Sequence, residues 1–145
     1  MQLDDPKEAE TKVAGRYQVL LILWIAMLTS FSIFLVMTFV IPSSAPPNLT
    51  LTFVLLALSL VAVIVSVLLK SYFLKQAIEK QQLPFLMNAY VTGFALSEAA
   101  AILGLLDHMA TNSRYFSIAF IMSAIGLLLH FPRKEHIRAS SYKQF

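Results

Sequence analysis

The sequence predicts an all-α integral membrane protein, a four-helix bundle with four transmembrane spans and both ends in the cytoplasm. Its composition is the first observation: of 145 residues, 58% are hydrophobic and 13% are charged, whereas soluble domains average about 45–50% apolar and about 25% charged. The second is that the apolar residues form long runs separated by short polar stretches. The third is that basic residues alternate between successive breaks, which orients the spans.

The four apolar runs have lengths that suit membrane-spanning helices. They lie at about 17–41, 49–69, 85–106 and 115–131. A bilayer core about 30 Å thick requires roughly 20 helical residues, so the first three runs are long enough and the fourth is near the lower limit. We therefore expect one transmembrane domain, 1–145, with polar tails at 1–16 and 132–145.

Prolines and polar residues mark the breaks between these runs. Segment 41–48 contains three prolines, which cannot continue a helix, so a tight turn should join the first two runs. Segment 70–84 is polar and reads as a frayed continuation of the second helix. Segment 107–114 predicts a short polar turn, and Pro132 should close the fourth helix.

The lysines and arginines predict the orientation of the chain in the membrane. Ten of the eleven lie in the two tails and the middle loop, namely Lys7, Lys12, Arg16, Lys70, Lys75, Lys80, Arg133, Lys134, Arg138 and Lys143. The other two loops contain only Arg114. Basic residues favour the cytoplasmic side, so both termini and the middle loop are expected there. We expect the membrane to be a bacterial inner (plasma) membrane.

One acidic residue, Glu98, interrupts the otherwise uncharged run 83–106. A carboxylate near the centre of a membrane helix costs roughly 2.5–3.5 kcal/mol, so it requires a partner or a function. By helical rise, the same depth in the other helices falls near Ser32, Ser59 and Ser123, whose hydroxyls could donate to the carboxylate. These four residues form a candidate ion-binding site.

Small residues line the side of the third helix that faces away from Glu98. At 100° per residue this face contains Ala89, Gly93, Ser97, Ala100 and Gly104. Small side chains allow helix backbones to approach closely in lipid. We therefore expect this face to pack against neighbouring helices, while Glu98 reaches a second helix of the chain or another subunit.

The residues around Glu98 also resemble a sequence pattern of a known protein family. The matching residues are Gly93, Ala95, Leu96, Glu98, Ala99, Ala101, Ile102, Gly104 and Leu105. This pattern resembles the carboxylate helix of the proteolipid c subunits of rotary ATP synthases. The resemblance implies that Glu98 binds H⁺ or Na⁺ and passes it along a rotating ring. The family's partner helix is rich in glycine, whereas segment 50–69 contains none.

Two functions follow from these observations. The first is a small structural or accessory membrane subunit that docks to itself or to a larger membrane complex through the small-residue face and Glu98. The alternative is an H⁺ (or Na⁺) carrier of the c-subunit type. The expected partners are the lipid bilayer and other membrane subunits or further copies of the chain, and no nucleic acid, because the basic residues flank apolar runs.

Catalytic and metal-binding patterns find no support in the sequence. There is no paired nucleophile and base, no phosphate-binding loop and no paired carboxylate, so we expect no enzymatic activity and no cofactor. Cysteine is absent. His108 and His130 are expected at opposite faces of the membrane, so they cannot converge on a metal ion.

Overall fold

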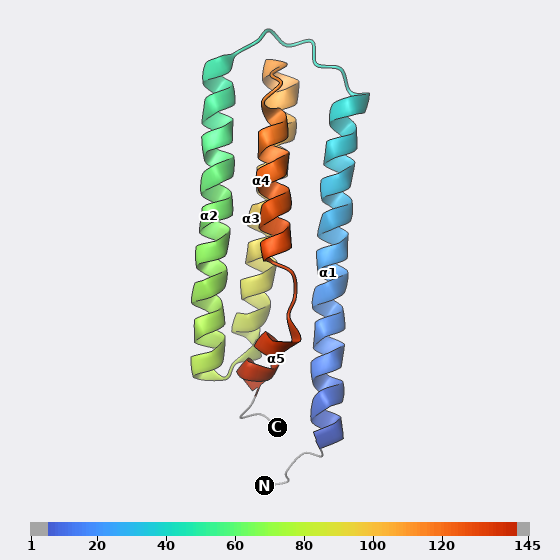
Figure 1. Ribbon diagram of the computed structural model, residues 1–145, viewed down its shortest axis with the longest axis vertical. Coiled ribbons are helices and arrows are strands. Elements are labelled where there is room, and N and C mark those ends of the chain that lie inside the picture. The colour runs from blue at the N-terminus through green and yellow to red at the C-terminus, as the bar shows by residue number, and fades with distance from the viewer. Residues whose placement is uncertain (1–5, 142–145) are drawn as a thin grey trace.

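The computed structural model of the chain describes the backbone of residues 6–141 and the side chains of residues 10–140. Over this range it is all-α, with five helices and no strand: α1 (Pro6–Val40), α2 (Leu49–Lys80), α3 (Leu83–Thr111), α4 (Phe116–Leu129) and α5 (Lys134–Ser141). Figure 1 shows that α1 to α4 run lengthwise beside one another, whereas α5 is short and lies at the end where α1 begins. We call this the α5 end, and the opposite end, crossed by the α1–α2 connection, the loop end.

Side-chain and backbone caps explain where the long helices begin and end. The Oδ1 atom of Asn48 accepts a hydrogen bond of 3.1 Å from the backbone N–H of Leu51 and so caps α2. Gln81 and Asn112 adopt left-handed backbone angles, with φ of 51° and 48°, and terminate α2 and α3. Two short connections therefore hold α3 antiparallel to both α2 and α4.

Several helices differ in length from the sequence-based prediction. α2 remains helical through Lys80, where fraying was expected, and α3 continues to Thr111. As a result, Asp107 and His108 lie inside a helix and not in a turn. α4 stops at Leu129, before Pro132, and α5 forms within the predicted tail. Favourable packing of these polar ends, described below, accounts for the longer α3.

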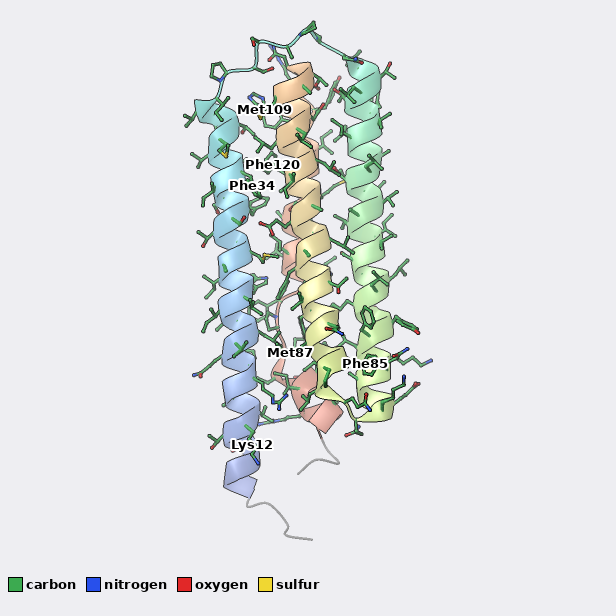
Figure 2. All side chains as sticks on the ribbon, turned by 180° about the vertical axis from the view of Figure 1, so that it is seen from behind. Lys12, Phe34, Phe85, Met87, Met109 and Phe120 are labelled. Carbon is green, nitrogen blue, oxygen red and sulfur yellow. The ribbon has the colours of Figure 1, made fainter. Side chains whose placement is uncertain are left out.

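The core lies mainly around α3. Its buried residues face α2 and α4 along one side and α1 along another. Near the α5 end, Tyr90 and Phe94 of α3 cluster with Leu20 of α1 and Ile137 of α5. In the other half, Figure 2 shows Phe34 and Phe120 in the space between α1 and the remaining helices.

Three helices are long and apolar enough to cross a membrane: Glu10–Val40, Leu49–Lys80 and Leu83–Thr111. The number rises to four if α4 and α5, which meet at a bend of 52°, form one span. In the most apolar 18-residue stretch of α1, 6% of the residues are buried inside the bundle. In the corresponding stretch of α3, 44% are buried. Most of the apolar surface of α1 is thus left for contact with lipid or with another membrane protein.

Candidate functional site

Polar side chains occupy three levels of this apolar bundle. Glu98 lies within α3, away from both ends. At the loop end is a group that we call the Asp107 cluster, formed by Thr52, Asp107 and Thr111. At the α5 end is the Lys70 cluster, formed by Lys70, Tyr90, His130, Arg133 and His136.

Glu98 is half-buried and lies on the side of α3 that faces α1. Its position follows from Phe94, one turn away, which belongs to the core cluster against which Trp24 and Met27 of α1 pack. Within the part of the chain that the structure describes, its carboxylate makes no hydrogen bond and no ion pair. A polar group at this level of a membrane helix is therefore left without a partner.

The three serines predicted at the depth of Glu98 donate to backbone carbonyl oxygens. Ser32 donates to Leu28 O at 2.8 Å, Ser59 to Leu55 O at 2.9 Å and Ser123 to Ser97 O at 2.6 Å. The structure thus brings Ser123 to the small-residue face and leaves Ser32 exposed on α1. An ion-binding role for these residues with Glu98 stays a prediction.

The small-residue face of α3 is covered by the chain itself. Ala89, Gly93, Ser97, Ala100 and Gly104 are all buried. A Cβ atom at Gly93 would overlap the imidazole ring of His130, and one at Gly104 would lie 3.0 Å from the Cβ of Ala119. These glycines therefore allow α4 and its end to approach the backbone of α3, and the face is not open to another protein.

The Asp107 cluster connects α2 to the last turns of α3. Oδ1 of Asp107 accepts hydrogen bonds of 2.8 Å from Thr52 Oγ1 and 2.7 Å from Thr111 Oγ1. The two threonine oxygens lie 3.0 Å apart. All three residues are 0% exposed, and Oδ2 of Asp107 has no partner among the described residues. The cluster is thus sealed within the bundle.

His108 extends the polar contacts at the loop end. Its Nε2 atom lies 3.0 Å from Ile41 O, and because a carbonyl only accepts, this nitrogen carries the hydrogen. The ring packs edge-on against Phe116 at 4.9 Å. The histidine therefore fastens the α1–α2 connection to α3 and α4. Among the described residues, no three histidine, aspartate or glutamate side chains converge as metal ligands.

At the α5 end, Lys70 reaches from α2 to the last residue of α4. Its Nζ atom donates a 2.9 Å hydrogen bond to Leu129 O and lies 4.8 Å from the centre of the Tyr90 ring. A cation over an aromatic face is stabilised by the ring quadrupole. The side chain is 9% exposed, so its charge is held in a mostly apolar environment.

Tyr90 links this lysine to the segment that follows α4. The backbone N–H of Arg133 donates to its hydroxyl oxygen at 3.2 Å, and that hydroxyl lies 2.7 Å from Nδ1 of His136. The tyrosine proton is then free to point at Nδ1, which requires a neutral imidazole. Burial, followed by the charges of Lys70 and Arg133, lowers the pKa of His136 below its ordinary value, which favours this neutral form.

His130 is fully buried against α3, and its ring nitrogens are unsatisfied. Its relative exposure is 0%, and neither Nδ1 nor Nε2 has a hydrogen-bond partner among the described residues. No hydrogen bond of good geometry reaches the ring, although the backbone of Ser66 and Leu129 lies beside it. Its Nε2 atom packs against Gly93, so the ring fills the space between α3 and the end of α4.

The sequence reading missed both end clusters. A signal for the Asp107 cluster existed, because the small-residue face at 93, 97, 100 and 104 continues in steps of three and four to 107 and 111. No comparable signal existed for the Lys70 cluster, which joins three helices and the segment after α4. Comparison of the chain with known protein families, with curated proteins and with solved structures found no match.

Proposed function

We propose that this chain is a non-enzymatic accessory subunit of the membrane, with four spans and both termini in the cytoplasm, that docks to another membrane protein through the α1–α3 side of the bundle. The observation that carries the proposal is Glu98, a half-buried carboxylate within a membrane helix that lacks a partner in the described chain. In lipid, such a group is stabilised when a neighbouring helix supplies a hydrogen-bond donor.

The distribution of charge supports the proposed orientation. The described basic residues at the α5 end are Lys12, Arg16, Lys70, Lys75, Lys80, Arg133, Lys134 and Arg138, whereas Arg114 lies at the loop end, between α3 and α4. Figure 2 places Lys12 near the start of α1, at the α5 end. An excess of lysine and arginine favours the cytoplasmic side. We expect α4 and the segment after it to form the fourth crossing, and α5, which carries Lys134 and Arg138, to lie at the cytoplasmic surface.

The surface around Glu98 supports docking by a partner's helix. The small-residue face is already occupied by α4, so it cannot serve as the contact. By contrast, α1 exposes apolar side chains along most of its length, and its Ser32 hydroxyl already donates to its own backbone. The partner is therefore expected to be a transmembrane helix that carries a donor, such as an amide, hydroxyl or basic group, at the level of Glu98.

Gentle purification from the native membrane tests this proposal with four forms of the chain. We expect the wild type and Glu98→Gln, which keeps hydrogen-bonding capacity, to co-purify with the partner, and Glu98→Leu to lose it. Asn88→Leu is the matched control, because Asn88 is an exposed polar residue of the same helix. Equal recovery of the partner with all four forms would overturn the docking role.

A carbodiimide experiment separates docking from ion transport by Glu98. In the docked form we expect the carboxyl to be protected from the reagent, and to become reactive once the chain is purified alone. Labelling that persists in the complex, varies with pH and is blocked by Na⁺ would instead support the carrier function. The unpartnered carboxylate is the feature that this second candidate shares with the first.

A further inference from the structure

We propose that the Lys70 cluster is a binding site for an anionic phosphate group, either the headgroup of a membrane lipid or a soluble phosphate. The site is a pocket of about 240 Å³ at the α5 end, below the last turn of α4. This is smaller than the roughly 300–1,000 Å³ of pockets for drug-sized ligands, and it suits a small polar group. The proposal is independent of Glu98.

The charge of the pocket is uniformly positive. Its polar lining consists of Lys70, Ser71, His130, Arg133 and His136, with no acidic residue. Lys70 and Arg133 both line this one small pocket. The nearest acid along the chain, Glu135, is exposed on α5 and does not line the pocket. An anion would therefore relieve the repulsion between Lys70 and Arg133.

The hydrogen-bond donors of the pocket are incompletely used. Lys70 has three N–H donors, of which one is directed to Leu129 O. His130 also lines the pocket, but it is fully buried with the backbone of Ser66 and Leu129 beside its ring, so it contributes little to the free donors. In the tautomer in which Nδ1 of His136 accepts from the Tyr90 hydroxyl, its Nε2 carries a hydrogen. Phosphate oxygens, which only accept, match this set of donors.

The position of the pocket favours a phosphate at the membrane surface. Lys70 follows the apolar part of α2, and α4 ends at Leu129 directly beside it. Trp24 of α1 donates to Leu127 O at 2.9 Å and packs edge-on against Phe131. An amphipathic indole ring, a side chain typical of the membrane interface, therefore lies beside the end of α4 on its α1 side. Basic pockets between membrane helices at this depth are typical sites for anionic headgroups.

The test measures lipid retention by the full chain purified in a neutral maltoside detergent. Native mass spectrometry compares phosphatidylglycerol with phosphatidylcholine, and inorganic phosphate is added as a competitor. We expect preferential retention of phosphatidylglycerol, and a loss of about fivefold with Lys70→Gln and with Arg133→Gln, since one basic residue near the headgroups contributes about 1 kcal/mol. Lys70→Arg should retain the lipid.

Lys75→Gln provides the matched control, because Lys75 lies on the same helix, is exposed and does not line the pocket. Arg133→Gln alters an exposed side chain, so the test remains decisive even if Lys70→Gln destabilises the bundle. Displacement of the lipid by millimolar inorganic phosphate, with the same dependence on Arg133, would support the phosphate site with a soluble source. Retention of phosphatidylglycerol by Lys70→Gln and Arg133→Gln at the wild-type level would overturn it.

Discussion

The two ends of the bundle bury ionisable side chains in different surroundings. At the loop end, Asp107 is enclosed with two threonine hydroxyls that donate to the same carboxylate oxygen, and all three residues are 0% exposed. At the α5 end, Lys70 is held by a carbonyl and an aromatic ring, but its cluster opens into a pocket. Polar groups that bond one another stabilise helix packing, whereas donors directed into a pocket are available to a ligand.

Gly93→Ala should produce the largest effect, and it should disrupt the packing at the α5 end without altering the loop end. A Cβ atom here overlaps the imidazole of His130, which is fully buried and cannot move without displacing the end of α4. We expect a loss of about 3 kcal/mol in the free energy of unfolding, at the upper end of overpacking effects, together with loss of lipid retention. Unfolding in mixed micelles can be followed by fluorescence of Trp24, the single tryptophan.

The matched substitution is Gly104→Ala, where the nearest atom, the Cβ of Ala119, is 3.0 Å away. A shift of a few tenths of an ångström relieves this contact, so we expect a loss of about 1 kcal/mol with lipid retention unchanged. If both glycine substitutions had the same effect on stability and on lipid, the close approach of His130 to α3 would not be the determining feature.

Asp107→Ala should destabilise the bundle by about 2 kcal/mol, because it removes the shared acceptor of Thr52 and Thr111 and leaves them only each other and the backbone carbonyl of residue 107. Thr52→Val removes one contact between α2 and α3 and should cost about 1 kcal/mol. Neither change should alter retention of phosphatidylglycerol. Ser117→Ala, at an exposed hydroxyl of α4, is the control. An effect of Asp107→Ala on lipid binding would connect two clusters that the structure keeps apart.

A change of pH should produce the smallest effect, and that effect should be confined to the α5 end. Burial and nearby cations hold the pKa of His136 below its ordinary value. A bound anion opposes this and raises the pKa, so binding takes up a proton and strengthens as the pH falls. Between pH 8 and pH 6 we expect retention of phosphatidylglycerol to rise about threefold.

The control for this measurement is His136→Gln, which should reduce the pH dependence while retaining part of the affinity. The remaining slope is expected from Lys70, because burial and then the charge of Arg133 lower its pKa from 10.5 to about 8. The other titratable groups that face His136 are Lys70, Tyr90, His130 and Arg133, with Glu135 beside it in the chain. Phosphatidylglycerol is the appropriate probe because its phosphodiester does not titrate in this range. An unchanged slope in His136→Gln would assign the proton to another of these groups.

Composition and periodicity were sufficient to predict an all-α chain with apolar helices that could span a membrane, because these properties depend on residues close in sequence. They also placed Glu98 opposite the small-residue face. The Asp107 cluster was harder to predict from the sequence, because Thr52 and Asp107 are 55 residues apart. The polar residues after Leu106 also predict a turn. The structure shows that these polar residues prolong the helix by bonding inside it.

The Lys70 cluster could not be read from the sequence for a different reason. Its members lie on α2, α3, the segment after α4 and α5, and their association depends on where α4 stops. That end point is not marked by Pro132, as the sequence suggests, but falls three residues earlier at Leu129. From the sequence, Lys70 is therefore interpreted only as one of the basic residues that orient the chain in the membrane. In the structure it is 9% exposed and packs on Tyr90.

The early end of α4 has a mechanical consequence for the surrounding membrane. Its 14 residues span about 21 Å, against a hydrocarbon core of about 30 Å. This hydrophobic mismatch is concentrated at one corner of the bundle, where the extended segment to α5 replaces helix. In the proposed four-span arrangement, lipids beside α4 would tilt or compress to cover it, and the leaflet there would be locally thinned. The protein would then gather into thinner regions of its membrane, independently of any partner.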